Sequence, residues 1–363
     1  MTIQDFIPKP YTEIVDNGSV SYQSPSNIAL VKYWGKYGEQ LPQNASVSFT
    51  LRKCRTETTV HYKKKNGDSF DFEVYLDGTR ELGFEPKIQK FFERVARYIP
   101  FIKKYRFIIK TKNSFPHSSG IASSASGMSA LAMCLVAIEK LLSFSKGEET
   151  QHNVYSLQKA SFLARLGSGS AARSLEGPLV VWGEHPKIEG SSNLFGTRYP
   201  NAIHENFSNY QDTILLVDKG EKQVSSTVGH DLMHHNAYAK ERFKEANNNL
   251  EKLISIFEQG DLGAFITLVE SEALQLHAMM MASKPYFILM KPNTLEILNR
   301  IWTFRNKTGS NVCFTLDAGA NVHVLYPASE KEKVCAFIEN ELAQFCKNRE
   351  FIHDAVGLGA TAL

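Results

Sequence analysis

The sequence predicts an α+β protein built from two domains. The chain has 363 residues, which is long for a single compact core and suits two domains. Patterns typical of short strands and patterns typical of helices occur in both halves, which indicates an α+β arrangement in each half. Residues 189–206 are rich in Ser, Asn, Gly and Pro. We therefore place the boundary there and expect domains at residues 1–205 and 206–363.

The first quarter of the chain is rich in predicted strands. Their residue composition favours strands at 19–22, 27–33, 46–51, 57–62 and 70–76. Three consecutive lysines, Lys63 to Lys65, precede Asn66-Gly67-Asp68. This combination predicts a solvated hairpin turn that joins strands 58–62 and 70–75.

The rest of the first half alternates between helices and strands. Ile88, Phe91, Phe92 and Val95 have helical spacing and predict a helix over 85–98. The remaining expected elements are a strand at 105–110, helices at 128–142 and 154–166, and a strand at 179–182.

The second half is expected to contain more helix. We predict a strand at 213–217, helices at 236–257, 262–282 and 295–306, strands at 312–316 and 322–326, and a closing helix at 331–346.

Composition excludes several classes of function. Apolar residues make up 43% and charged residues 22% of the chain, as in ordinary globular proteins, and a net charge of +3 gives no reason to expect nucleic acid as a partner. Residues 1–17 mix charges with prolines, and the apolar stretches are expected to be too short to span a membrane. The five cysteines are scattered without a C-x-x-C pair, which supports neither a disulfide framework nor a zinc site. We expect a cytoplasmic protein.

The most informative segment is a loop rich in serine and glycine. Residues 116–127 contain five serines and two glycines, carry no charge, and lead into an apolar helical run. The free N–H groups and the positive end of a helix at such a loop bind phosphate, and serine hydroxyls can ligate Mg²⁺. The structural alternative is a serine-capped helix in a seam of small residues. The chain has neither a Walker motif nor a G-x-G-x-x-G fingerprint after a strand.

Three further positions carry charge in unusual surroundings. Lys32 lies in an apolar strand beside Tyr33, Trp34 and Lys36, Arg173 follows a Gly/Ser turn, and Asp317 ends an apolar strand before a glycine turn. Each alone has a structural explanation, such as a Lys32–Asp317 ion pair or an arginine cap. Together with a phosphate loop, they indicate phosphoryl transfer, which needs a phosphate cradle, an acid that orients the acceptor, and cations.

These motifs carry a family resemblance. The loop resembles the second motif of the GHMP kinase superfamily, and Asn27 to Lys36 resemble the narrower N-I-A-x-x-K-Y-W-G-K signature of diphosphomevalonate decarboxylases. Similar matches to that family follow at Phe115–Ala125 (F-P-x-x-x-G-L-A-S-S-A), 168–174 (S-G-S-A-x-R-S), 222–227 (K-x-V-S-S-T) and 314–319 (F-T-x-D-A-G). These matches follow one another in the same order as in the family, from residue 25 to residue 325, and so cover nearly the whole chain.

The resemblance implies a two-domain GHMP kinase-like fold. Its N-terminal half would resemble the second domain of ribosomal protein S5, its C-terminal half would be an α/β sandwich, and a deep cleft would separate them. The implied activity is the ATP-dependent decarboxylation of mevalonate 5-diphosphate to isopentenyl diphosphate, in isoprenoid biosynthesis, with ATP and Mg²⁺ bound. The implied partners are a small-molecule substrate and a second copy in a homodimer, without nucleic acid or membrane.

The resemblance also assigns roles to residues. Asp317 would face the substrate's 3-hydroxyl, Lys32 would pair with Asp317, and Arg173 would grip the carboxylate that leaves as CO₂. The substrate set would also contain Asn27, Ser168 and Ser170, with Tyr33, Lys36 and Ser226 at the 5-diphosphate. The ATP phosphates would be held by Ser118, Ser119, Gly120, Ser123 and Ser124, with Ser124 a candidate Mg²⁺ ligand.

Two departures from the family pattern leave alternatives open. His117 stands in Pro116-His117-Ser118-Ser119 where P-T-A-A is common, and Ala320 stands where proline is usual. A mevalonate 5-phosphate decarboxylase, a mevalonate 3-kinase and a non-catalytic ATP-binding regulator are alternative functions. A pure 3-kinase would not need the Lys32–Asp317 pair, and a regulator would be expected to lack Asp317 or the loop serines.

Overall fold

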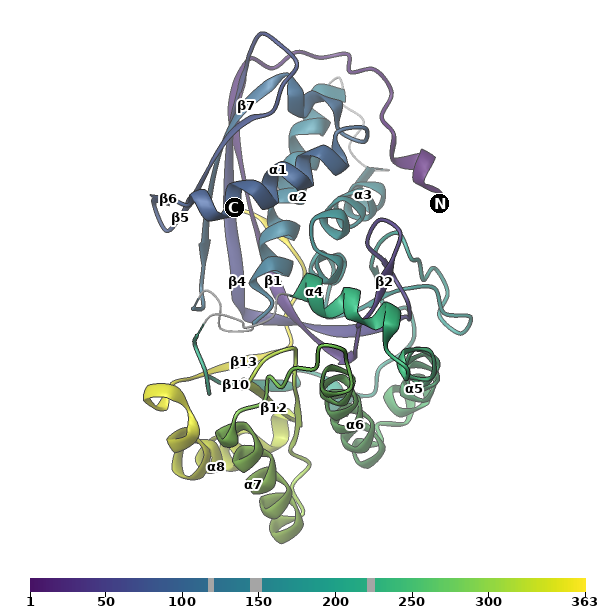
Figure 1. Cartoon of the computed structure of the whole chain (residues 1–363), viewed down its shortest axis with the longest axis vertical. Helices are drawn as coiled ribbons and strands as arrows, with labels where there is room; N and C mark the ends of the chain where they lie inside the picture. Colours follow the sequence, from purple (N-terminus) through teal and green to yellow (C-terminus); the bar gives the residue numbers. More distant parts are fainter. Residues whose placement is uncertain (117–120, 144–151, 221–225) are drawn as a thin grey trace.

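Two large sheets, each covered by helices, are stacked along the long axis of the molecule (Figure 1). A small two-stranded sheet pairs β2 (Lys36–Tyr37) with β3 (Leu41–Pro42). The computed structural model describes residues 1–116, 121–143, 152–220 and 226–363. The upper part in Figure 1 contains mainly N-terminal residues, and the lower part contains mainly C-terminal residues. The position of the domain boundary at residues 205 and 206 stays a prediction.

The first sheet is built around two long antiparallel strands, β1 (Asn17–Val31) and β4 (Ser46–Lys64). The sequence predicted two strands in each of these segments, and the structure joins each pair into one. Register shifts between Pro25 and Asn27, and again between Ala29 and Val31, interrupt the pairing, so the local strand signals looked separate. The long β1 delivers Lys32 to the end of the sheet that faces the lower domain.

The predicted lysine-rich hairpin is wrong in its strand pairing. Strand β7 (Tyr105–Asn113) lies between β4 and β5 (Asp71–Leu76), antiparallel to β4 and parallel to β5. A parallel pair needs a crossover connection, which α1 (Glu85–Val95) supplies here. The turn residues were read correctly as a chain reversal, but turn chemistry does not determine which strand the chain pairs with next.

Short strands complete this sheet. The sheet order is β14-β1-β4-β7-β5-β6, with β8 paired to β4 and β9 paired to β8. The additional strands are β6 (Thr79–Arg80), β8 (Leu179–Trp182), β9 (Thr197–Arg198) and the C-terminal β14 (Thr361–Ala362).

The helices of the upper domain pack together over the sheet. These are α1, α2 (Ser123–Ser143) and α3 (His152–Gly167). Helix α2 is long and apolar enough to cross a membrane by length and composition, contrary to the expectation that no segment is. However, 72% of its most apolar window is buried inside the protein, and its residues Leu131 and Leu135 belong to the core formed with Phe92 and Phe107. Its apolar character is therefore explained by packing.

The second sheet has four strands in the order β11-β12-β10-β13. They are β10 (Gln211–Leu215), β11 (Cys313–Thr315), β12 (Val322–Tyr326) and β13 (Phe351–Ala355). The helices of this half are α4 (Ser226–Asp231), α5 (Ala239–Gln259), α6 (Leu262–Met281), α7 (Pro292–Thr308) and α8 (Lys331–Phe337).

Most predicted elements of the second half are confirmed, but its end differs. The predicted closing helix ends as α8 at Phe337 and continues through a π-helical segment, Ile338–Leu342, and a short 3₁₀ segment, Ala343–Phe345. The sequence analysis missed α4, β13 and β14. Each has at most six residues, which is too short for a hydrophobic period to be recognised.

The two halves share one hydrophobic core. Ile28 and Leu30 of β1 belong to the same buried cluster as Leu253 of α5, Val269 of α6 and Ile214 of β10. The chain also returns at its end, where β14 pairs with β1. This shared core fixes the end of β1 against α6, which is where the candidate site lies.

Candidate active site

A pocket with a volume of about 150 Å³ lies where the two halves meet. Its wall contains the three residues predicted to be catalytic, namely Lys32, Arg173 and Asp317. Five other predicted site residues also line it: Tyr33, Lys36, Ser124, Ser168 and Ser170. The upper domain supplies most of this wall, and Asp317 with Ala318 comes from the loop between β11 and β12 of the lower domain.

Lys32 and Asp317 form an ion pair across the domains. Nζ of Lys32 donates a hydrogen bond to Oδ1 of Asp317 at 3.1 Å, although the two residues are 285 positions apart. The lysine side chain is 1% exposed and the aspartate side chain 31% exposed. Burial lowers the pKa of Lys32, while Asp317 and Glu272 raise it. The ammonium is thus buried against a carboxylate that still reaches the pocket.

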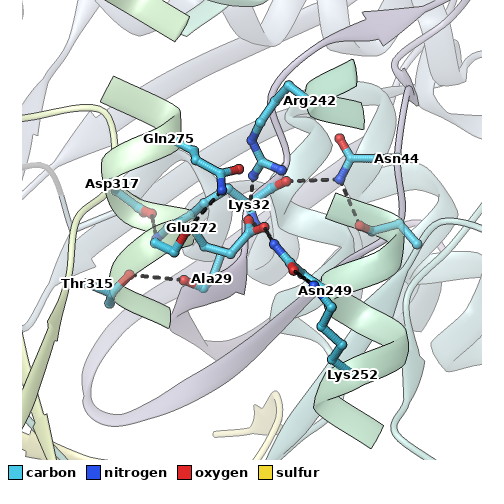
Figure 2. Close-up of polar contacts among 12 residues, drawn as sticks. Ala29, Lys32, Asn44, Arg242, Asn249, Lys252, Glu272, Gln275, Thr315 and Asp317 are labelled. Carbon is cyan, nitrogen blue, oxygen red and sulfur yellow. Dashed lines mark hydrogen bonds and ion pairs between the residues drawn. The ribbon is translucent and has the colours of Figure 1, made fainter. Parts of the chain in front are cut away.

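A buried carboxylate, Glu272 of α6, holds the backbone of Lys32 (Figure 2). Its Oε2 accepts a hydrogen bond from the Lys32 N–H at 2.9 Å and also pairs with Arg242. Its Oε1 accepts one from the side chain of Asn249 at 2.7 Å. Glu272 is fully buried, so three donors compensate its charge.

Two further contacts secure the same region (Figure 2). The Lys32 carbonyl accepts a hydrogen bond from Asn44 at 3.0 Å, and the Thr315 hydroxyl donates to the Ala29 carbonyl at 3.4 Å. The second contact ties β11, two residues before Asp317, to β1. The positions of both partners in the ion pair are therefore determined by the packing of whole elements.

Arg173 lies in a turn that glycine makes possible. It belongs to a 3₁₀ segment, Gly169–Ser174, after α3. A Cβ at Gly169 would lie 2.7 Å from the Tyr33 hydroxyl and 2.9 Å from the Trp182 ring, so only glycine fits this close approach.

The Arg173 guanidinium is held on one edge. Nε donates to the Ser48 hydroxyl at 2.6 Å and Nη1 to the Ser46 hydroxyl at 2.7 Å. The guanidinium also lies near the rings of Tyr33 and Trp182. Burial lowers its pKa to about 10, so it remains a cation at neutral pH. Among the described residues Nη2 has no hydrogen-bond partner, which leaves this corner of the fork for a ligand.

The described part of the serine-rich loop leads into α2 at the pocket wall. Ala122, with a φ of 42°, turns the chain into the helix, and Ser124 lines the pocket. The Ser124 hydroxyl lies 3.3 Å from that of Ser168. Ser123 is the first residue of α2, outside the pocket lining. Ser118, Ser119, Gly120 and His117 lie outside the described residues.

The predicted diphosphate end contains Tyr33, Lys36 and α4. Nζ of Lys36 lies 3.7 Å from Oδ1 of Asp231 in α4, and burial lowers its pKa while Asp231 raises it. Burial raises the pKa of Tyr33, so its hydroxyl stays protonated. Ser226 begins α4, and its side chain lies outside the description.

Asn27, like Ser123, is a predicted site residue that lies outside the pocket wall. It is buried, and its amide donates to the Ser174 hydroxyl at 2.7 Å and to the Ser170 carbonyl at 3.2 Å. It therefore fastens the turn that carries Arg173. Its predicted contact with substrate stays a prediction.

Sequence reasoning missed three residues beside the site. These are Glu272, His277 and His230. The N–H at Nε2 of His277 donates to the Asp317 carbonyl at 3.2 Å, and His230 lines the pocket. A signal was present for Glu272 and His277, because both interrupt the apolar run of α6. His230 follows the matched segment 222–227 by three residues.

Comparison with known families identifies both halves. Residues 24–193 match the model of the diphosphomevalonate decarboxylase-like N-terminal domain, and residues 213–358 match that of the mevalonate 5-diphosphate decarboxylase C-terminal domain. Among curated relatives, diphosphomevalonate decarboxylase of Saccharomyces cerevisiae is 29% identical over 340 residues, covering 88% of this chain and 81% of the yeast protein. The Rattus norvegicus protein of the same name is 27% identical, covering 83% and 75%.

Comparison with solved structures points to the same family as the comparison of sequences. A structure of MDDEF in complex with MVAPP, AMPPCP and magnesium has a TM-score of 0.80 and 26% identity, covering 95% of this chain and 98% of that chain. Mevalonate diphosphate decarboxylase from Staphylococcus aureus has a TM-score of 0.79 and 26% identity, covering 96% and 98%. The GHMP kinase-like fold with two domains that the motifs implied is thereby confirmed.

Proposed function

The chain belongs to the diphosphomevalonate decarboxylase family, and we propose that it converts mevalonate 5-diphosphate and ATP into isopentenyl diphosphate, ADP, phosphate and CO₂. The observation that carries the proposal is the assembly of Lys32, Asp317 and Arg173 in one pocket between the domains. This trio combines an ionised acid with a cation that can hold a carboxylate.

The first half of the reaction is phosphoryl transfer to the tertiary 3-hydroxyl. Asp317 accepts the hydrogen bond of that hydroxyl and takes its proton late, as the oxygen bonds to the γ-phosphorus of ATP. Lys32 keeps the carboxylate ionised, because protonating Asp317 would leave a buried ammonium without its partner. ADP leaves with the electrons of the broken P–O bond.

The second half is the loss of phosphate and CO₂. The C3–O bond breaks with its electrons on the phosphate, and positive charge develops at C3. The electrons of the C–C bond to the carboxylate then form the new double bond, and CO₂ departs. The free corner of Arg173 is suited to hold the carboxylate so that this bond aligns with the departing phosphate.

The residues at the start of α2 fit the phosphates of ATP and a magnesium ion. The helix presents its positive end to the pocket, and the neighbouring hydroxyls of Ser124 and Ser168 are hard oxygen ligands. In the described parts of the chain, no three His, Cys, Asp or Glu side chains gather into a metal site, so ATP phosphates would supply most other ligands. When bound, Mg²⁺ neutralises phosphate charge.

Turnover with three substrates tests the proposal. The protein is incubated with Mg²⁺, ATP and mevalonate 5-diphosphate labelled in the carboxylate, and ADP and labelled CO₂ are counted. We expect equal amounts of both, and much less product from mevalonate 5-phosphate or mevalonate. ADP without CO₂ would instead identify a 3-kinase, and a preference for the monophosphate would identify the other decarboxylase.

The order of events can be tested with a substrate that carries fluorine near C3. Fluorine withdraws electrons and destabilises the positive charge of the second half, so the reaction should stop after phosphoryl transfer. Rapid quench should show ADP and a 3-phosphorylated species without CO₂. If CO₂ appears without ADP, phosphorylation does not come first.

The homodimer and the cytoplasmic location expected from the sequence stay predictions. Light scattering during size-exclusion chromatography would measure the mass in solution against the 40.8 kDa of one chain.

A further inference from the structure

His230 occupies a position at the pocket that no motif assigned. It lies in α4, one helical turn after Ser226, and it lines the same pocket as Lys36 and Arg173. Its ring is packed between two aromatic rings, with centroid distances of 4.3 Å to Tyr33 and 4.6 Å to Trp34. This packing holds the ring in one orientation.

A backbone contact determines which nitrogen of His230 carries the proton. The N–H of Gly35 donates to Nδ1 at 2.9 Å, so Nδ1 is the acceptor and the neutral ring carries its proton on Nε2. Burial, with Lys36 and Arg173 nearby, lowers the pKa of His230 to about 3. The imidazole is therefore neutral and has one N–H to donate.

That N–H is available to a ligand. Among the described residues Nε2 has no hydrogen-bond partner, and it is not one of the fully buried polar atoms that lack one. By contrast, the guanidinium of Arg173 and the ammonium of Lys32 already have protein partners. The pocket thus contains a rigid neutral donor beside its cations.

We propose that His230 is a substrate-binding residue whose Nε2–H donates a hydrogen bond to an oxygen of the 5-diphosphate. This inference rests on the proposed function and adds a residue to the same site. The diphosphate is the favoured acceptor because α4 also carries Asp231, the ion-pair partner of Lys36, so His230 lies at the Lys36 end of the pocket. A neutral donor orients an anion there without adding a further charge beside Lys36.

A matched pair of variants separates the two nitrogens. In His230→Asn, the side-chain oxygen can replace Nδ1 and accept from Gly35, but the donor at Nε2 is lost. In His230→Gln, the longer amide can place an N–H near the position of Nε2. Both variants lose the same aromatic packing against Tyr33 and Trp34, so a structural effect should be similar in both.

Steady-state kinetics give the main readout. We expect His230→Asn to raise the KM for mevalonate 5-diphosphate about 10- to 100-fold, as for the loss of a hydrogen bond to a charged group. The KM for ATP should change less than about twofold, and His230→Gln should recover most of the loss. An unchanged KM in His230→Asn, or an equal rise in both variants, would overturn the proposal.

Inorganic pyrophosphate tests which group of the substrate is contacted. Its inhibition constant against mevalonate 5-diphosphate should rise in His230→Asn by a factor similar to the KM. If only the KM rises, His230 contacts another part of the substrate and the proposed contact is wrong. Calorimetric binding of pyrophosphate to the wild type and to both variants does not depend on turnover. It therefore still tests His230 if the wild type fails to decarboxylate, which would by itself contradict the proposed function.

Discussion

At the residue scale, the central feature is the unequal exposure of the Lys32–Asp317 pair. The ammonium is enclosed, whereas the carboxylate is 31% exposed and can face a ligand. Asp317→Asn keeps the size of this group but removes the charge and the ability to take a proton. We expect kcat to fall about 10²–10⁴-fold or more, with nearly unchanged ATP binding, measured by turnover and by nucleotide titration.

An exposed aspartate provides the control for this substitution. Asp68 follows β4, pairs with Lys104, and is 63% exposed. Asp68→Asn should leave kcat and ATP binding at wild-type values. Near-normal product formation by Asp317→Asn would refute the role of Asp317.

Arg173 offers a second test because its role depends on shape as well as charge. Lysine retains the charge but cannot donate to Ser46, Ser48 and a carboxylate in one plane. Arg173→Lys should therefore raise the KM for mevalonate 5-diphosphate and slow decarboxylation, about 10- to 100-fold in kcat/KM. The KM for ATP should barely change. Arg300→Lys, at a partly exposed position of α7 that does not line the pocket, is a matched control. Wild-type kinetics in Arg173→Lys, or a defect confined to ATP, would be incompatible with a carboxylate clamp.

Sequence reasoning could find Lys32, Arg173 and Asp317 because each places a charge among apolar or small residues. Glu272 gives a similar signal, because it interrupts the apolar run of α6, but neither Glu272 nor His230 could be assigned its contact from the sequence. Their partners, Lys32 and Gly35, lie 240 and 195 positions away, and nothing in the local sequence indicates those contacts.

At the element scale, α6 acts on the site through Glu272. Its carboxylate binds the Lys32 backbone and raises the pKa of Lys32 against the effect of burial. Removing the charge in Glu272→Gln should lower that pKa further. Since Lys32 is needed as a cation, the alkaline limb of the kcat profile should move to lower pH. The other two charges that act on Lys32 are the same in the variant and the wild type: Arg173 lowers the pKa of Lys32, and Asp317 raises it. A difference between the two pH profiles therefore reports on Glu272.

Arg242→Gln separates this electrostatic effect from loss of stability. Breaking the buried Arg242–Glu272 pair from either side should cost about 3–5 kcal/mol of unfolding free energy. However, Arg242→Gln leaves the Glu272 charge in place, so the alkaline limb should not move to lower pH. Identical pH profiles for Glu272→Gln and the wild type would contradict an effect of Glu272 on the pKa of Lys32 and would leave Glu272 with a role in stability alone.

The limits of sequence prediction are also clearest in the elements. Alternation and turn residues predicted β5 and β7 close to their observed positions, since these signals are local. The insertion of β7 between β4 and β5 depends on the crossover through α1, which is a property of the assembled sheet.

At the scale of the whole molecule, the motif order predicted two halves facing a common site. It did not predict the return of β14 to β1 or the core shared by β1, α5 and β10. Such contacts join segments that are far apart in the sequence, as in the pairing of Tyr22 with Ala362. They make the site depend on the integrity of both halves.

A buried histidine at this junction, His277, predicts that the folded protein loses stability in mild acid. His277 is 1% exposed, sits beside Asp317 and Lys32, and has its pKa lowered from 6.5 to about 4, mainly by burial. In the unfolded chain it takes up a proton near pH 6.5, whereas in the folded protein it stays neutral down to about pH 4. The unfolded state therefore binds more protons between these values. The contribution of His277 to stability is complete above pH 6.5 and falls by about 1.4 kcal/mol per pH unit as the pH decreases towards 4.

The prediction is tested by comparing the wild type with His277→Gln. The glutamine amide can keep a donor for the Asp317 carbonyl but does not titrate. Unfolding free energies from urea titrations at pH 7.5, 6.0 and 5.0 should fall less steeply with acid for the variant than for the wild type. At pH 7.5 the variant is expected to be the less stable protein, because it packs less well. The difference in unfolding free energy between the two proteins should narrow by about 1.4 kcal/mol per pH unit below pH 6.5. A difference that stays constant from pH 7.5 to pH 5.0 would mean that His277 takes up its proton over the same pH range in the folded and the unfolded protein, so that burial does not lower its pKa. The interior beside Lys32 and Asp317 would then be more open to water than the structure indicates.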